Sequence, residues 1–191
     1  MGVLSSGRED FRGLRTSKLL VSACIVVLAV AACARAERLP TEHSGYRISI
    51  FVDRVDSLHW EATIDLANIG VIAAMTLPMR WGDGRSPFRL DSADYRGLRT
   101  EYFALKTLRV DSTKQSVLLG MISDMGGNYP PLESGSGSIA RLYFSTRRPV
   151  TTPPVLDTTF IAPHNTLQLV TPDVRAIRPD FQPVGTSTRD R

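Results

Sequence analysis

The sequence has little cysteine: its 191 residues contain only Cys24 and Cys33, and both lie near the N-terminus. The chain beyond Ala36 can therefore form no disulfide bond, and it has no thiol to act as a nucleophile or a metal ligand. Its stability must come from packing alone, and about 150 residues suffice to bury a hydrophobic core. The sequence thus excludes a disulfide-stapled scaffold and a thiol-dependent enzyme.

An excess of charge is also missing from most of the chain. The formal net charge is +4, but residues 1–36 hold five of the 23 basic residues and only two of the 19 acidic ones. From Glu37 on, 18 basic residues are balanced by 17 acidic residues, a net charge of +1. Nucleic-acid-binding proteins usually carry a concentrated basic surface. We therefore predict no nucleic-acid partner.

Motifs of the common catalytic classes are absent. The sequence contains no Gly-x-Ser-x-Gly nucleophile motif. Its run Gly82–Gly84 is acidic where a phosphate-binding loop would need a lysine. The paired carboxylates of a glycosidase need only spatial proximity, so a small carbohydrate-active enzyme stays possible. No catalytic residue, cofactor or metal is predicted.

One strand face comes nearest to a metal or acid–base site. His59, Glu61 and Asp65 follow one another at steps of two or four residues, which places them on the same side of a strand. A catalytic zinc needs several ligands that converge on a cavity, and an exposed strand face does not provide one. A solvated strand face is therefore favoured. Two aspartate pairs lack the dense ligands of a calcium loop and are predicted to cap turns: Asp53 with Asp56, and Asp91 with Asp94.

Segments with a helical period are missing too, and the sequence has alternation instead. The clearest stretch runs from Trp60 to Trp81. Apolar residues occupy every second position from Trp60 to Leu66, and the alternation resumes at Ala73 after a turn marked by Asn68 and Gly70. Because side chains alternate across a strand, each half is predicted to be a half-buried strand. Two such strands are typical of a β-sandwich whose core they line.

Similar short strands continue along the chain and are separated by turn residues. About nine strands and no useful helical segment predict an all-β fold, an antiparallel β-sandwich. The glycine-rich runs Gly126–Pro131 and Gly135–Ser138 are predicted to bracket a long loop. The predicted domain covers residues 46–183, after a tether at 37–45 and before a polar tail at 184–191. The other predicted strands are Tyr46–Val52, Phe88–Ser92, Leu108–Asp111, Val117–Ile122, Ile139–Phe144, Thr158–Ile161 and Leu167–Val170, with Ile177–Phe181 as an added edge.

Residues 1–36 form a predicted signal peptide. A polar segment with net positive charge precedes the uninterrupted run of apolar or small residues Leu19–Ala34. That run is short for a membrane span and ends in small residues, as signal peptides do.

Two cleavage sites compete in this leader. Val30–Cys33 resembles a bacterial lipobox, in which Cys33 would become the lipidated first residue and anchor the protein to a membrane. Ala34–Ala36 resembles an ordinary cleavage site that releases a soluble protein from Glu37. We favour the lipobox because only it explains a cysteine at this position. The predicted location is extracytoplasmic, as a bacterial outer-membrane or cell-surface lipoprotein or otherwise as a secreted protein.

Several stretches, taken in order, resemble the cohesin domain family over about residues 46–170. A strand that ends in an asparagine turn is followed by an aromatic-ended strand, and later by a glycine-rich lead into Ile-Ala-x-Leu-x-Phe. The stretches are Ala62–Asn68, Ile72–Trp81, Leu90–Ser92, Tyr102–Asp111, Val117–Ile122 and Gly135–Phe144.

The resemblance implies a jelly-roll sandwich of about nine strands, related to cellulose-binding modules. Cohesins are non-catalytic, and they bind dockerin modules to assemble extracellular polysaccharide-degrading complexes. A dockerin-like protein partner is therefore implied, and no enzymatic activity. These 191 residues contain one such domain, with no dockerin-like calcium repeat and no catalytic module.

The strand Ile72–Trp81 is apolar on both sides. The side that starts at Ala73 is assigned to the core, and the opposite side consists of Ile72, Ala74, Thr76, Pro78 and Arg80. Strand Val117–Ile122 is similar. A sandwich strand needs only one apolar face, so the second face is either covered by a loop or used for contact.

The loop Ser123–Ser134 could provide that cover. The resemblance favours contact instead, because the matching strands of cohesins lie side by side in the sheet that receives dockerin. The predicted partner-binding residues are Ala74, Thr76, Pro78, Arg80, Leu118 and Ile122.

Two other functions remain open. A carbohydrate-binding module, or a small carbohydrate-active enzyme, would hold a polysaccharide by stacking sugars on exposed aromatic rings. Trp60 and Trp81 share their sides with core residues, which leaves Tyr95, Tyr102 and Tyr129 for that role. A purely structural envelope lipoprotein is the third hypothesis.

Overall fold

The computed structural model describes residues 45–183, and this range contains eleven strands and no helix. The leader with Cys33, nearly all of the tether and the polar tail lie outside the described residues. None of the described residues belongs to a helix that could span a membrane. The strands are β1 (Arg47–Arg54), β2 (His59–Asn68), β3 (Ala74–Arg80), β4 (Phe88–Asp94), β5 (Leu105–Asp111), β6 (Ser116–Ile122), β7 (Gly135–Thr146), β8 (Asp157–Thr158), β9 (Gln168–Val170), β10 (Ala176–Ile177) and β11 (Asp180–Pro183).

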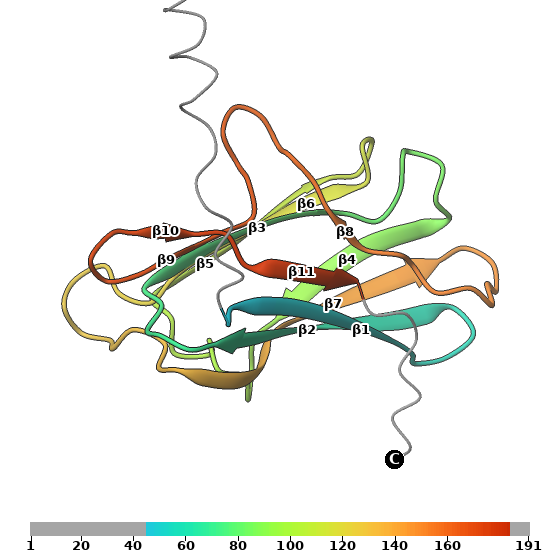
Figure 1. Ribbon diagram of the computed structural model, residues 1–191. Coiled ribbons are helices and arrows are strands. Elements are labelled where there is room, and N and C mark those ends of the chain that lie inside the picture. Colours follow the sequence, from blue (N-terminus) through green and yellow to red (C-terminus); the bar gives the residue numbers. More distant parts are fainter. Residues whose placement is uncertain (1–44, 184–191) are drawn as a thin grey trace, which may run out of the picture. The chain divides into compact units, whose positions relative to one another are not determined.

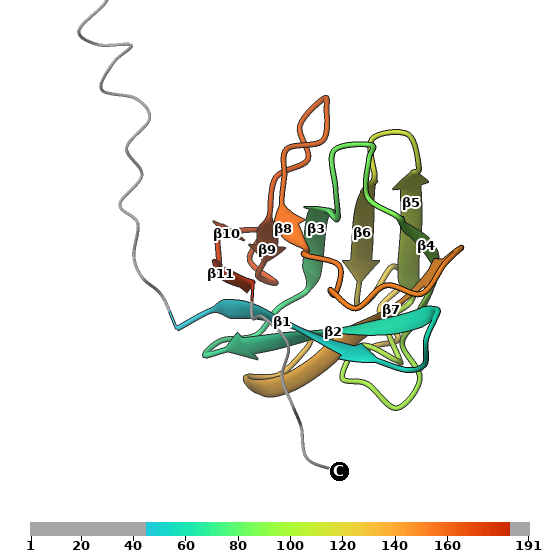
Figure 2. The ribbon, with the colours of Figure 1, turned by 90° about the vertical axis from the view of Figure 1, so that its right-hand side faces the viewer.

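The strands form two sheets that pack face to face (Figure 1). The first sheet has the order β11-β1-β2-β7-β4, and the second has the order β10-β9-β3-β6-β5, with β8 also paired to β3. Figure 2 shows the two layers from a second side. The predicted antiparallel β-sandwich of jelly-roll type is confirmed. One pair departs from the prediction, because β1 and β11 run parallel.

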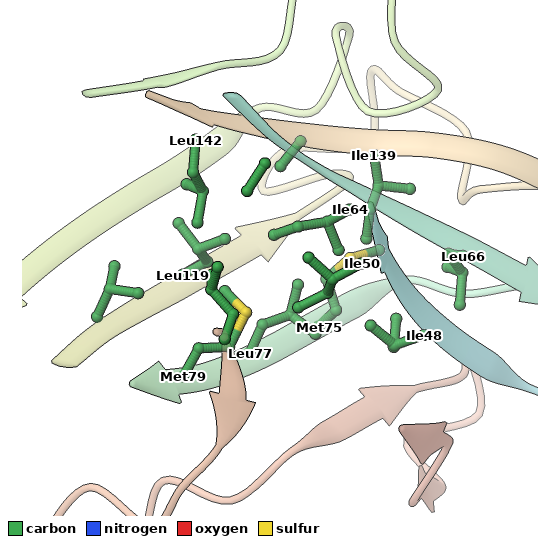
Figure 3. Close-up of a cluster of buried hydrophobic side chains, with 14 of the residues drawn as sticks. Ile48, Ile50, Ile64, Leu66, Met75, Leu77, Met79, Leu119, Ile139 and Leu142 are labelled. Carbon is green, nitrogen blue, oxygen red and sulfur yellow. The ribbon is translucent and has the colours of Figure 1, made fainter. Parts of the chain in front are cut away.

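The core between the sheets comes from the alternation seen in the sequence. Ile48 and Ile64 of the first sheet meet Leu77 and Leu119 of the second, and all four side chains are at most 1% exposed (Figure 3). Trp60 and Trp81 are also buried, as predicted. At about 25 cal/mol per Å² of apolar surface, such burial dominates the stability of a domain without disulfides.

The chain from Trp60 to Trp81 does not form a hairpin. β2 and β3 belong to different sheets, so the turn after β2 carries the chain across the sandwich. Asn68, predicted as a turn residue, is the last residue of β2 and is buried. Its Nδ2 donates to the carbonyls of Gly70 and Glu133 at 2.7 and 3.0 Å.

The run Gly135–Ser138 is not the predicted loop, since it forms the start of β7. Gly135 and Gly137 have φ angles of +148° and +143°, which side-chain-bearing residues rarely adopt. The side chain of Arg99 lies over both glycines, and a Cβ on Gly137 would approach it to 3.2 Å. The two glycines thus provide room for the Arg99 side chain. This contact could not be predicted from the sequence pattern, because Arg99 is remote from them in the chain.

Arg99 ties three segments together at this end of the first sheet. Its guanidinium donates to the Leu66 carbonyl at 2.9 Å, to Asn68 Oδ1 at 3.0 Å and to the Glu133 carbonyl at 2.7 Å. The backbone N–H of Arg99 donates to the Ser138 carbonyl at 3.0 Å. Partial burial lowers the pKa of Arg99, because desolvation disfavours the charged form.

Candidate functional site

The outer side of the second sheet is set by strand alternation. Met75, Leu77 and Met79 of β3 point into the core, as do Val117, Leu119 and Met121 of β6, so the intervening residues point outward. Strand register joins the outward residues of three strands into rows. We call this surface the outer β3–β6–β5 face. Its residues are Ala74, Thr76, Pro78, Arg80, Ser116, Leu118, Gly120, Ile122, Leu105, Thr107, Arg109 and Asp111.

Five of the six predicted partner-binding residues have side chains that solvent reaches. Ala74, Thr76, Leu118 and Ile122 are half-buried, and Arg80 is exposed. Register pairs Ala74 directly with Ile122, so the residues from the two strands form one continuous surface. This surface is small and apolar at its centre, where charged groups are absent from β3 and β6 between Arg80 and Ile122.

Pro78 differs from its neighbours because it is buried. Its carbonyl accepts from the Thr159 N–H at 3.1 Å and from Thr158 Oγ1 at 3.4 Å, so the chain leaving β8 lies against it. We therefore regard Pro78 as a residue that shapes the edge of the face.

Ile72 was predicted to share this outward side, and that prediction is wrong. The residue precedes β3 and is fully buried. It exchanges two backbone hydrogen bonds with Leu132, at 2.9 and 2.8 Å, and Leu132 is buried as well. Ile72 and Leu132 both belong to the buried core, so Ile72 does not contribute to the outward side, whereas Ala74, Thr76, Leu118 and Ile122 remain partly accessible.

The middle of the face is flat because of Gly120. Register places Gly120 between Thr76 and Thr107. A Cβ built on Gly120 would come within 2.7 Å of Thr107 Oγ1, which instead donates to the Gly120 carbonyl at 3.2 Å. A flat centre of small side chains allows the backbone of a partner to approach closely.

The rim of the face is charged, and sequence patterning did not find all of it. Arg80 lies 3.6 Å from the carboxylate of Asp157 on β8. Arg109 and Leu105 join from β5 and were missed because the sequence pattern does not show that β5 pairs with β6. Phe160, which follows the Thr159 bonded to Pro78, is 61% exposed.

The outer side of the first sheet is polar and internally paired. Glu61 lies 3.7 Å from Arg141, and Asp65 accepts from Ser138 Oγ at 2.7 Å. His59 Nδ1 lies 2.8 Å from an Asp56 carboxylate oxygen. The three residues His59, Glu61 and Asp65 are thus engaged with different partners. The described residues contain no cluster of three or more possible metal ligands.

Two of the aspartates cap turns as predicted. Asp56 Oδ1 accepts from the backbone N–H groups of Leu58 and His59 at 2.7 and 2.9 Å. The hydrogen bond from the Leu58 N–H, followed by that from the His59 side chain, lowers the pKa of Asp56. Asp94 Oδ1 accepts from the N–H of Tyr95 at 2.9 Å, and its pKa is lowered chiefly by the Arg96 side chain.

The tyrosines proposed for sugar stacking do not share one environment. Tyr102 and Tyr129 are 37% and 47% exposed, and the Tyr102 hydroxyl donates to the Pro131 carbonyl at 3.2 Å. Tyr95 is half-buried, and its hydroxyl is buried with no hydrogen-bond partner among the described residues. Burial raises the pKa of Tyr95.

No protein-family model matches the sequence, and no curated protein matches it. Solved structures do resemble the domain. The sixth cohesin of scaffoldin B from Acetivibrio cellulolyticus, solved with a mutant Cel5 dockerin, has a TM-score of 0.56 at 13% identity, over 73% of this chain and 95% of that chain. The described domain has the cohesin fold.

Two more cohesins extend this comparison. A type I cohesin–dockerin complex from Clostridium thermocellum has a TM-score of 0.55 at 10% identity, over 71% of this chain and 94% of the other. A non-cellulosomal cohesin from Archaeoglobus fulgidus, a hyperthermophilic archaeon, has a TM-score of 0.51 at 11% identity, over 72% and 86%. At such low identity the comparison shows the fold alone.

Proposed function

We propose that this cohesin-fold domain is a non-catalytic module that binds a protein partner on the outer β3–β6–β5 face. The observation that carries the proposal is the accessible, uncharged centre of that face. An apolar surface with a charged rim is the usual anatomy of a protein–protein contact. The partner residues are Ala74, Thr76, Leu118 and Ile122 at the centre and Arg80 at the rim, with Pro78 behind them.

The preferred partner is a dockerin-like module. Two of the structural neighbours were solved with dockerins bound. The archaeal neighbour is non-cellulosomal, so the fold also occurs outside cellulosomes. A polysaccharide-related assembly on the cell exterior is the setting that we infer, with Cys33 as a lipid anchor that holds the module to a membrane.

The test is a charge placed at the centre of the face. Thr76→Glu would bury a carboxylate without a partner on binding, and an unpaired buried charge costs several kcal/mol. We expect affinity for a dockerin module from the same proteome to fall about 100-fold or more, measured by calorimetry. A pull-down from that proteome with residues 37–191 identifies the module.

The matched control is Ser92→Glu, which adds the same charge to an exposed position of β4 in the first sheet. Both variants must keep the circular dichroism spectrum and melting temperature of the parent. Unchanged binding by a folded Thr76→Glu protein would eliminate this face, and equal losses in both variants would point to a non-specific effect of charge.

The anchor has a separate test. If Cys33 is lipidated, the protein partitions into detergent, and Cys33→Ala abolishes that partitioning. Recovery of a mature protein that begins at Glu37 would instead show ordinary secretion.

A further inference from the structure

A pocket of about 420 Å³ lies on the first sheet, away from the outer β3–β6–β5 face. It forms where β7 ends and β4 begins, because register pairs Phe88 with Thr146 and Arg89 with Ser145. The chain that leaves β7 through Arg147 and Arg148 closes its other side. We call it the β4–β7 pocket.

Three of the residues that line the pocket are arginines. Arg89 lies 3.3 Å from Asp91, and its side chain is 79% exposed. Arg147 and Arg148 are exposed, and within residues 45–183 neither lies within ion-pair distance of a carboxylate. By contrast, Arg141 of the same sheet is matched by Glu61. The pocket therefore has uncompensated positive charge and favours an anion.

The volume and lining of the pocket narrow the kind of anion. Pockets of 300 to 1,000 Å³ hold organic ligands, and an inorganic anion would fill only part of this one. Pro87 and Val150 provide aliphatic surface, and Ser145 contributes a hydroxyl beside the guanidinium groups. This lining is rich in hydrogen-bond donors, so it suits a ligand with a carboxylate, many oxygen acceptors and an aliphatic ring face.

We propose that the β4–β7 pocket binds a carboxylate-bearing sugar unit, such as the uronate of an acidic polysaccharide. Arg147 and Arg148 hold the carboxylate, and Arg89 joins by leaving Asp91. Ser145 contacts a ring hydroxyl, while Pro87 and Val150 pack on the C–H face of the sugar. This site goes beyond the proposed protein-binding function and does not depend on it.

The β4–β7 pocket is remote from the start of β1. Strand β1 begins at Arg47, and at its far end Arg54 pairs with Trp60 of β2. Next to this pair, His59 of β2 pairs with Ser145 of β7. The eight residues of β1 span about 25 Å. By this register, the pocket lies at the opposite end of the first sheet from Arg47, where β1 begins.

The experiment is a titration of the protein without its leader, residues 37–191, with trigalacturonate, followed by NMR. We expect shifts at the backbone amides of 145–148, 150 and 88–89, and an affinity that weakens with added salt. The double variant R147Q/R148Q should lose at least tenfold in affinity. The matched control R47Q/R178Q, which removes the same charge from exposed positions outside the pocket, should bind like the parent.

Further ligands separate the sources of anionic chemistry. Neutral trigalactose should not bind, and inorganic phosphate, tri-glutamate and phosphatidylglycerol vesicles should all bind more weakly than trigalacturonate. Tighter binding of any of these four, no binding of trigalacturonate, or an equal loss in the control variant would overturn the proposal. Thr76→Glu should leave uronate binding intact, so failure here and failure of the protein-binding proposal are distinguishable.

Discussion

The two sheets of this sandwich differ in the polarity of the side chains on their outer sides. Each sheet buries one apolar side in the core, and each must present its other side to the surroundings. The first sheet does so with paired polar groups, such as Glu61 with Arg141 and Asp65 with Ser138. The second presents Ala74, Thr76 and Leu118, whose side chains are half-buried and uncharged.

This difference shows which surface folding leaves free for another use. Polar outward residues satisfy one another and keep the first sheet soluble. Within residues 45–183, no ion pair joins side chains at the centre of the second sheet's outer side. This uncharged, partly accessible side is the surface on which we propose that a partner binds.

The largest expected effect on stability is a difference between two neighbouring residues of β6 whose side chains point to opposite sides of the sheet. Leu119→Ala should lower the free energy of unfolding by about 3 kcal/mol, because the side chain is fully buried and leaves a cavity. Leu118→Ala, on the outer face, should cost less than about 1 kcal/mol. Urea denaturation measures both. Equal losses would mean that the outer face is part of the core, and the comparison would fail.

Arg99→Ala is expected to have the next largest effect. The variant loses hydrogen bonds to Leu66, Asn68 and Glu133, and it leaves those acceptors only partly reached by water. We expect a loss of about 2 kcal/mol by urea denaturation. Arg99→Lys, which keeps the charge but not the fork of donors, should recover less than half of it. Full recovery by lysine would show that charge alone matters.

Acid should loosen the loop Ser123–Ser134. Asp124 accepts from the N–H groups of Gly126, Gly127, Asn128 and Tyr129. Those bonds, that of Gly126 first, lower the pKa of Asp124 below its ordinary value of 3.8. The stabilisation is therefore complete above about pH 4 and is lost as pH falls through the folded-state pKa.

Hydrogen exchange of the amides of 126–129 between pH 3 and 6 tests this expectation. After correction for the intrinsic rate, protection should fall at the acid end in the parent protein. Asp124→Asn should show low protection at every pH. A pH-independent protection in the parent would remove the role of this carboxylate.

The smallest effect is expected on the polar face itself. Glu61→Gln breaks an ion pair whose side chains are about one-third exposed and whose atoms are 3.7 Å apart. Such pairs contribute less than about 1 kcal/mol, and salt screens them. We expect a change of about 0.5 kcal/mol or less in low salt and none at about 1 M salt. A larger, salt-independent loss would mean that Glu61 does more than solvate the first sheet.

The sequence predicted the core strands well because their signal is local. The alternate apolar residues from Trp60 to Leu66 and from Met75 to Trp81 are all buried, as the pattern predicts. It failed where the deciding partner is distant. Gly135–Ser138 has loop composition, yet it forms a strand because Arg99 and β2 lie against it.

The candidate site shows the same division. Alternation alone placed Ala74, Thr76, Leu118 and Ile122 on outward sides of two strands. It could not show that Ile72 packs in the core beside Leu132 or that Pro78 is buried beside β8, since both depend on segments more than 50 residues away. Arg109 entered the face only through the register of β5 with β6.

By itself, then, the sequence determined that this protein folds around alternating strands without disulfides, and which side of each long strand is apolar. The tertiary structure decided which apolar sides are covered and which arginines gather at one end of the first sheet. The reason is physical. Side-chain direction along a strand follows from local backbone geometry, whereas burial and the meeting of charges depend on contacts between segments that are remote in the chain.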